Sequence, residues 1–208
     1  MITQSNRCVI ICGAKEIYVP PILSTDFVIA VDYGYAHAIN NNILPNLIVG
    51  DFDSYTGDLP TNTEIITAPK EKDDTDTLLA VKTALRRGYT DFCLLAALGA
   101  RLDHQIANFS VAAFIAQSGA KCEMISSDTV VNTIKNTSID IKNIDGYSLS
   151  VFSHSDKAFG VSIKNAKYSL ENSTLSNLFP IGVSNCFLTD TATISVENGI
   201  LHIVQSKL

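Results

Sequence analysis

Asp51 and Asp53 are the residues of this chain best placed to hold a metal ion. They follow the apolar run 47–49, which predicts a buried strand ending at Gly50. Residues i and i+2 of an extended chain point to the same side, so both carboxylates can bind one hard cation. Asp and Ser would also suit a simple turn after a strand, and the motif is weak when it stands alone.

A second acidic cluster opens a predicted helix further along the chain and contains Lys72, Asp73, Asp74 and Asp76. Acids at a helix N-terminus are stabilised by the helix dipole, and either Asp74 or Thr75 could cap the helix. A cap does not need so many neighbouring acids, however, and a bound cation would offset their repulsion. We therefore interpret Asp76 as a metal ligand, whereas Lys72 could contact phosphate or neutralise Asp73.

A third polar cluster lies between an apolar run and a predicted helix. Gly99 lets the backbone approach a ligand closely, and Arg101 offers a planar guanidinium suited to phosphate oxygens. Asp103 could cap the helix or contact a ligand, and His104 could be a base or a structural residue. Asn108 lies about one turn further along and could face the same site.

Asp32 ends a further predicted strand, where an acid is well placed for a ligand, although Gly34 could simply make a turn there. Together the clusters indicate one site at the edge of a parallel sheet. Mg²⁺ with a nucleoside triphosphate fits this site, because Mg²⁺ prefers a few carboxylates with phosphate oxygens and water. The common Gly-rich nucleotide motifs are absent, so metal, Arg101, Lys72 and backbone groups must hold the phosphates.

Composition narrows the class of protein. The chain has 208 residues, of which 46% are hydrophobic, enough for one large domain or two small ones. A net charge of −6 argues against nonspecific nucleic-acid binding. Five cysteines without paired spacing predict reduced thiols in a cytoplasmic protein. No signal peptide or membrane-length apolar run is visible, so we expect no membrane association.

Strand and helix patterns alternate in the first part of the chain, which predicts an α/β fold with an open, mostly parallel sheet and flanking helices. Gly88 and Gly119 mark helix ends. The predicted strands are 7–13, 27–32, 47–50, 64–68, 92–98 and 121–126, and the predicted helices are 33–43, 76–87 and 103–117.

After residue 128 the pattern changes to short strands with alternating polarity, which predicts a small antiparallel β domain. Asn198-Gly199 lies between two strand-like runs and predicts a hairpin. We therefore expect two domains, 1–127 and 128–208. Further turns are predicted at 136–137, 145–146, 165 and 171–172.

The order of these motifs resembles the thiamine pyrophosphokinase family, and the segments 164–170 and 182–185 look like later signatures of that family. The resemblance covers nearly the whole chain. It implies transfer of pyrophosphate from ATP to the hydroxyl group of thiamine, giving thiamine diphosphate and AMP. It also implies an N-terminal α/β ATP-binding catalytic domain, a C-terminal thiamine-binding β-sandwich, and a homodimer with a shared thiamine site.

The same resemblance assigns roles to particular residues. It implies that Mg²⁺ and phosphates are served by Asp51, Asp53 and Asp76, that the cleft is also lined by Asp32, Arg101 and Asp103, and that Ser184 and Asn185 lie near thiamine. Asp73 and Asp103 both remain candidates for the base that accepts the hydroxyl proton. The chain has no tryptophan, so an aromatic wall against thiamine must be Tyr or Phe.

Other functions stay open from the sequence. A pyrophosphokinase acting on a pterin alcohol would keep the carboxylate clusters and need a different acceptor pocket. A noncatalytic thiamine or nucleotide sensor would keep the fold without needing so many acids. A metal-dependent glycosyltransferase that uses Asp-X-Asp is a third alternative.

Overall fold

The structure is a computed structural model that describes residues 6–15, 17–51, 60–67, 73–99 and 101–208. The chain divides into two compact units. One comprises Met1–Val111 with Met124–Ser127, and the other comprises Ala112–Glu123 with Asp128–Leu208. Helix α3 (Leu102–Gln117) and strand β6 (Lys121–Ile125) therefore contribute residues to both units.

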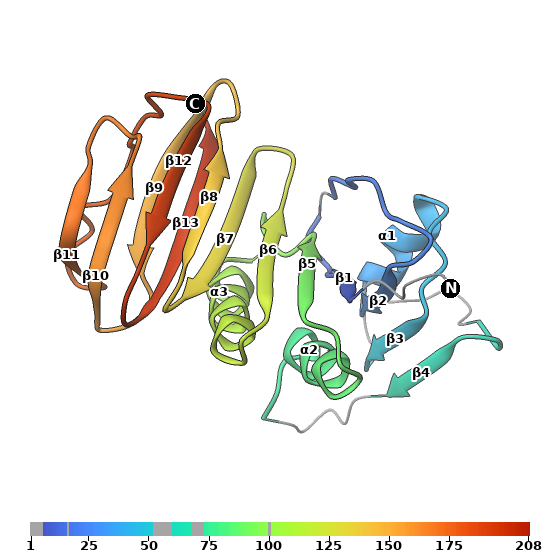
Figure 1. Cartoon of the computed structure of the whole chain (residues 1–208). Coiled ribbons are helices and arrows are strands. Elements are labelled where there is room, and N and C mark those ends of the chain that lie inside the picture. Colours follow the sequence, from blue (N-terminus) through green and yellow to red (C-terminus); the bar gives the residue numbers. More distant parts are fainter. Residues whose placement is uncertain (1–5, 16, 52–59, 68–72, 100) are drawn as a thin grey trace. The chain divides into compact units, whose positions relative to one another are not determined.

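The first unit is built on parallel strands in the order β4-β3-β2-β1-β5 (Figure 1). The inner strands are almost wholly apolar and buried, as expected when both faces of a parallel sheet are covered. The bounds are β1 Arg7–Ile11, β2 Phe27–Val31, β3 Leu47–Gly50, β4 Glu64–Thr67 and β5 Asp91–Leu95.

Helices α1 (Gly34–Asn40) and α2 (Asp76–Arg86) pack on these strands. Tyr35 and Ala38 of α1 join the core cluster that contains the β1 side chains. Thr75 caps α2, because its hydroxyl accepts a hydrogen bond of 3.2 Å from the Leu78 N–H. That cap resolves the choice between Asp74 and Thr75. No helix in the described ranges has the length and apolar character needed to span a bilayer.

Two predicted elements are shorter than expected for the same physical reason. The helix predicted over 33–43 ends at Asn40, and Asn42 has φ 56°. The strand predicted over 92–98 ends at Leu95, and Ala96 has φ 48°. A residue in the left-handed region continues neither a right-handed helix nor a strand. Asp32, with φ 48°, ends β2 in the same way.

The second unit contains antiparallel strands in the orders β7-β13-β9 and β11-β10-β12-β8. Side chains from both groups of strands form one core cluster, which includes Ile134, Leu149, Ile163 and Ile194. The predicted fold class is thereby confirmed. The bounds are β7 Thr129–Lys135, β8 Ser138–Lys142, β9 Tyr147–Ser153, β10 Lys157–Lys164, β11 Leu170–Ser176, β12 Thr191–Ser195 and β13 Ile200–Lys207.

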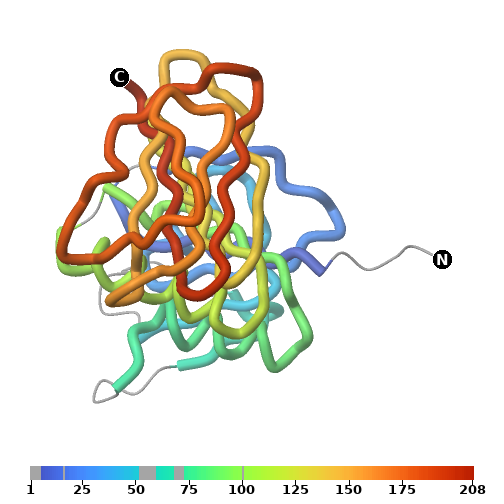
Figure 2. The backbone as a smooth tube through the Cα atoms, turned by 60° about the vertical axis from the view of Figure 1, so that its left-hand side comes forward, coloured from blue at the N-terminus to red at the C-terminus, as the bar shows by residue number. Residues whose placement is uncertain are grey.

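The prediction of a hairpin at Asn198-Gly199 is wrong. The strands on either side of it, β12 and β13, belong to different sheets and do not pair. The dipeptide instead bonds to a third segment, since the Phe159 N–H donates to the Asn198 carbonyl at 2.8 Å. Figure 2 shows the strands of the second unit, coloured yellow to red, running back and forth beside one another. A turn-forming sequence therefore marks a reversal of the chain without fixing which strands pair.

Two histidines, the buried His202 and the exposed His154, lie in contact in the second unit. The Nε2 atom of His202 is 3.1 Å from Nδ1 of His154, and its Nδ1 atom is 3.0 Å from the Thr133 hydroxyl. His202 occupies β13 between the core residues Leu201 and Ile203, so its side chain leaves the sheet on the opposite face. Burial, together with the neighbouring His154, lowers the pKa of His202 to about 4.

We expect this pair to weaken the second unit in acid. The unfolded chain binds a proton at His202 near pH 6.5, whereas the folded chain does so only near pH 4, so stability should fall as pH drops through that window. The loss should be at most about 3 kcal/mol. Urea unfolding at pH 7 and pH 5 measures it. His202→Gln should flatten the slope, while Thr133→Val should lower stability yet keep the slope; an unchanged slope in His202→Gln would contradict the assignment.

Candidate active site

A cavity of about 480 Å³ opens in the first unit, where the carboxyl ends of β1, β2 and β5 meet the N-terminal turns of α2 and α3. Ligands in open parallel sheets bind at such strand ends. The cavity is lined by Cys12, Gly13, Ala14, Val31, Asp32, Tyr33, Thr75, Asp76, Thr77, Ala96, Asp103, His104, Ala107 and Asn108.

Backbone hydrogen bonds fix the wall formed by the end of β1. The Cys12 N–H donates to the Leu95 carbonyl at 2.8 Å, and the Ala14 N–H donates to the Ala96 carbonyl at 3.0 Å. The buried His37 ring places Nε2 2.6 Å from the Ala14 carbonyl. This wall is therefore held from both β5 and α1.

The end of β2 lies directly against the end of β3. A Cβ atom added at Gly50 would collide with the Asp32 carboxylate, so a side chain at position 50 would displace that carboxylate. The Asp32 N–H also donates to the Val49 carbonyl at 3.0 Å. The structure thus brings the Asp32 motif beside the start of the motif that contains Asp51.

Helix dipoles add positive potential to the cavity. Asp76 lies in the first turn of α2 and Asp103 in the first turn of α3, and both line the cavity. N–H groups at a helix N-terminus favour anions such as phosphates. Two helix starts and three carboxylates, those of Asp32, Asp76 and Asp103, therefore make a site that can take both a cation and an anion.

Arg101 and Asp103 form an exposed ion pair beside the cavity. The guanidinium of Arg101 donates to both Asp103 oxygens, at 2.6 and 3.2 Å. This hydrogen bonding lowers the pKa of the Asp103 carboxyl, which makes it a weaker proton acceptor. A contact between Arg101 and a phosphate would compete with the pair.

Asn108 and Cys12 can be assigned structural parts in the cavity wall. The side-chain amide of Asn108 donates to the Ala97 carbonyl at 2.8 Å and so ties α3 to the loop after β5. Burial raises the pKa of the Cys12 thiol to about 12, which keeps this thiol in its protonated form.

The remaining predicted residues lie elsewhere or outside the described residues. Asp51 is half-buried after β3, and Asp73 and Arg101 are exposed; none of these three lines the cavity. Gly34 begins α1, where a Cβ atom would collide with the Ile11 carbonyl, so it serves close packing. The two that fall outside the described residues are Asp53 and Lys72.

The donor set of this cavity fits Mg²⁺. Within the described residues, no group of three or more His, Cys, Asp or Glu side chains is gathered closely enough to hold a metal ion unaided. Mg²⁺ does not require such a group, because it usually takes one or two carboxylates and completes its shell with water and substrate phosphates. Asp32 and Asp76 supply carboxylates on adjoining walls of the cavity.

Sequence reasoning missed several wall residues, among them Ala14, Tyr33, Thr77 and Ala96. One signal could have found the first two: β1 and β2 are both apolar strands followed by small or glycine residues, and parallel neighbours end at the same edge. Ala96 could not be found this way, because it lies inside an apolar run that reads as strand.

The residues expected near an acceptor lie in the second unit. Asn185 is buried, and its amide group bonds both backbone groups of Tyr168, at 2.9 and 2.7 Å. It therefore fixes the backbone of Tyr168, whose ring is exposed. Ser184 has φ 57°, and its N–H donates to the Ser150 hydroxyl at 3.0 Å. Ser184 is exposed beside this clamp.

Two family profiles match the chain. Residues 22–124 match "Thiamin pyrophosphokinase, catalytic domain", and residues 136–201 match "Thiamin pyrophosphokinase, vitamin B1 binding domain". The thiamine pyrophosphokinase of Bacillus subtilis is 25% identical over 184 residues, which is 86% of each chain.

Solved structures share the fold. The crystal structure of the Bacillus subtilis thiamine pyrophosphokinase superposes with a TM-score of 0.86 at 22% identity, covering 97% of this chain and 98% of that one. A thiamin pyrophosphokinase family protein from Enterococcus faecalis gives a TM-score of 0.81 at 26% identity, covering 97% and 99%. The thiamin pyrophosphokinase from Candida albicans gives 0.78 at 14% identity, covering 98% and 90%.

Proposed function

This chain belongs to the thiamine pyrophosphokinase family, and from that premise we propose that it transfers pyrophosphate from ATP to the hydroxyl group of thiamine, giving thiamine diphosphate and AMP. The family resemblance read from the sequence is thereby confirmed. The cavity at the carboxyl ends of β1, β2 and β5 carries the proposal, because carboxylates and helix N-termini converge on it. The alternative acceptors and the sensor role are not favoured by these matches.

We propose that ATP binds in this cavity with its phosphates near Asp32 and Asp76 and the N-termini of α2 and α3. Bound Mg²⁺ would neutralise charge that develops on the phosphate oxygens during transfer. The side chains position the β-phosphorus for in-line attack by the thiamine hydroxyl, and AMP leaves. Asp73 and Asp103 remain the candidate proton acceptors; on binding ATP phosphate, Arg101 would release Asp103 and restore its basicity.

The direct test incubates the purified chain with ATP, Mg²⁺ and thiamine and measures AMP and thiamine diphosphate. We expect equal amounts of the two products and none after chelation of Mg²⁺. If the chain pyrophosphorylated a pterin alcohol and left thiamine unchanged, the acceptor would be the pterin alcohol and not thiamine. Binding of thiamine without any turnover would show that the chain is a sensor and not an enzyme.

For the acceptor, we propose that Ser184 contacts thiamine and that Tyr168, held by Asn185, offers the aromatic face. The Lys167 ammonium lies over one face of this exposed ring, 5.5 Å from its centroid, so the other face would take a flat aminopyrimidine or a cationic thiazolium. Ser184→Ala should raise the KM for thiamine about five- to tenfold through one lost hydrogen bond, with the KM for ATP unchanged. Steady-state kinetics with each substrate varied in turn measures this. Ser138→Ala, which removes another exposed hydroxyl of the second unit, is the control; equal changes in both KM values would contradict the contact.

We also propose a cytoplasmic homodimer. The strands β11 and β8 are edges of their sheet, and a small β domain must cover such edges. The family resemblance implies a thiamine site shared by two subunits. Sedimentation should give twice the chain mass, and activity should fall on dilution as the dimer dissociates. A monomeric mass with activity independent of concentration would contradict the dimer.

A further inference from the structure

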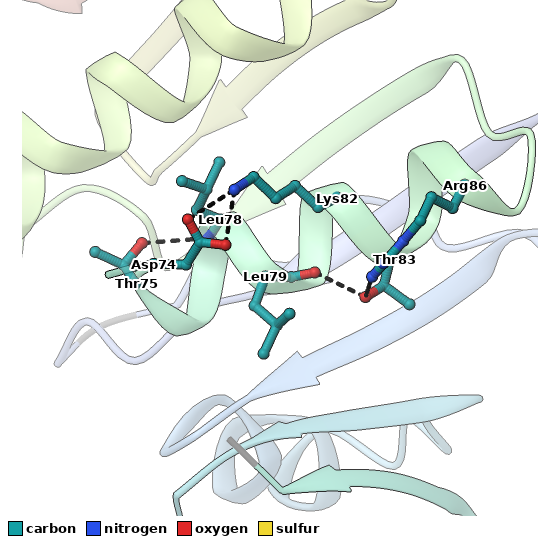
Figure 3. A network of polar contacts seen from close by, with 7 residues as sticks. All are labelled: Asp74, Thr75, Leu78, Leu79, Lys82, Thr83 and Arg86. Atoms are coloured by element: carbon teal, nitrogen blue, oxygen red, sulfur yellow. Dashed lines mark hydrogen bonds and ion pairs between the residues drawn. The ribbon is translucent and has the colours of Figure 1, made fainter. Parts of the chain in front are cut away.

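Asp74 and Lys82 form a two-pronged ion pair along α2 (Figure 3). The ammonium of Lys82 lies 2.7 Å from each Asp74 oxygen. Their side chains are 29% and 38% exposed, so the pair is partly shielded from water. Asp74 precedes the Thr75 cap, and Lys82 is two turns into the helix, so the pair spans the side of α2 past Leu78.

This ion pair separates the acids of one short segment. Asp76 and the cap Thr75 line the cavity, whereas Asp74, adjacent to Thr75 in the chain, does not. Its carboxylate instead lies against the flank of the helix, where the Lys82 charge offsets it. Loss of the Lys82 ammonium would remove the ion pair that holds this second carboxylate on the flank of the helix.

We propose that Lys82 is a positioning residue that withholds Asp74 from the nucleotide site, leaving Asp76 as the carboxylate that α2 presents there. This inference rests on the proposed ATP site. A loose carboxylate at this helix N-terminus would repel the phosphates and compete with Asp76 for the cation, because like charges a few ångströms apart interact strongly where water is partly excluded. The role belongs to Lys82 through Asp74, so neither residue needs to touch ATP.

The test measures the Kd of a nonhydrolysable Mg²⁺-ATP analogue by calorimetry, together with the thiamine KM. Lys82→Met should raise the Kd about tenfold, as expected for one added repulsive charge, and leave the thiamine KM unchanged. Asp74→Asn should keep the wild-type Kd. The double variant should return to the wild-type Kd, because no loose carboxylate remains, and Lys82→Arg should also bind normally.

A second ion pair, at the other end of α2, provides a control. Arg87, just past the other end of α2, donates to both Glu64 oxygens at 2.6 and 3.0 Å. Arg87→Met should lower stability to a degree comparable with Lys82→Met but leave the Kd unchanged. An unchanged Kd in Lys82→Met, or a double variant that binds as weakly as Lys82→Met, would overturn the positioning role. Failure of the wild-type chain to bind the analogue would overturn the proposed ATP site itself.

Discussion

Replacement of Asp76 with asparagine should remove most pyrophosphate transfer while the fold is retained. Asp76 lines the cavity from the first turn of α2, beside the positive end of the helix dipole. Charge neutralisation at a phosphoryl-transfer site is worth several kcal/mol, so kcat should fall by about 100-fold or more. Product formation under saturating ATP and thiamine measures this loss.

Asp74→Asn is the matched control for that substitution. It removes the same charge two positions earlier, from a side chain that is bound to Lys82 and does not line the cavity. It should keep activity near the wild-type level. Wild-type turnover by Asp76→Asn at ordinary Mg²⁺ concentrations would remove Asp76 from the site, and circular dichroism of both variants should match the wild-type chain.

The second large effect concerns folding. A Cβ atom at Gly34 would collide with the Ile11 carbonyl and approach the Cys12 carbonyl at 3.0 Å, so α1 could not keep its place against the end of β1. Gly34→Ala should therefore lower the free energy of unfolding by about 3 kcal/mol, the upper range for overpacking. Because α1 also holds the Ala14 wall through His37, ATP binding should weaken in the fraction that folds.

Gly119→Ala separates the steric effect from backbone strain. Gly119 has φ 84° and no heavy atom within 4 Å of an added Cβ, so alanine there meets only the cost of a left-handed conformation, about 1 kcal/mol. Urea unfolding of both variants gives the two values. A loss in Gly34→Ala no larger than that in Gly119→Ala would show that α1 can move aside at little cost.

The sequence alone predicted those elements whose hydrophobic pattern reflects their burial or whose first residue is marked by a cap. The apolar strand 47–50 and the helix from Asp76 were predicted almost as observed, because burial on both faces and a clear cap leave a direct mark on the sequence. The sequence alone did not predict the end of an element where a single backbone φ angle determines that end. Ala96 ends β5 through its left-handed conformation, and an alanine after an apolar run carries no sign of that.

In the candidate site too, the sequence predicted part of the arrangement and not the rest. Asp32, Asp76, Asp103 and Asn108 were placed together because parallel strands end at one edge. Sequence could not reveal how each side chain is already engaged. Asn185 carries a donor and an acceptor that suit a ligand, yet the structure uses both on the Tyr168 backbone, and such partners depend on a fold that brings distant segments together.

The crossing at Asn198-Gly199 has a consequence for the speed of folding. The chain passes from one sheet to the other between β7 and β8, β8 and β9, β9 and β10, and β12 and β13. Most pairings of the second unit therefore join distant segments. Leu201 of β13, for example, pairs with Ile134 on one side and Ser153 on the other. Among strands β7 to β13, all of which the structure describes, consecutive strands pair only at β10 and β11. Long loops must close, at a cost in entropy, before these non-local strand pairs form, and this slows folding. The second unit should therefore fold in roughly milliseconds to seconds, in a single cooperative step. The β10–β11 hairpin is its natural nucleus.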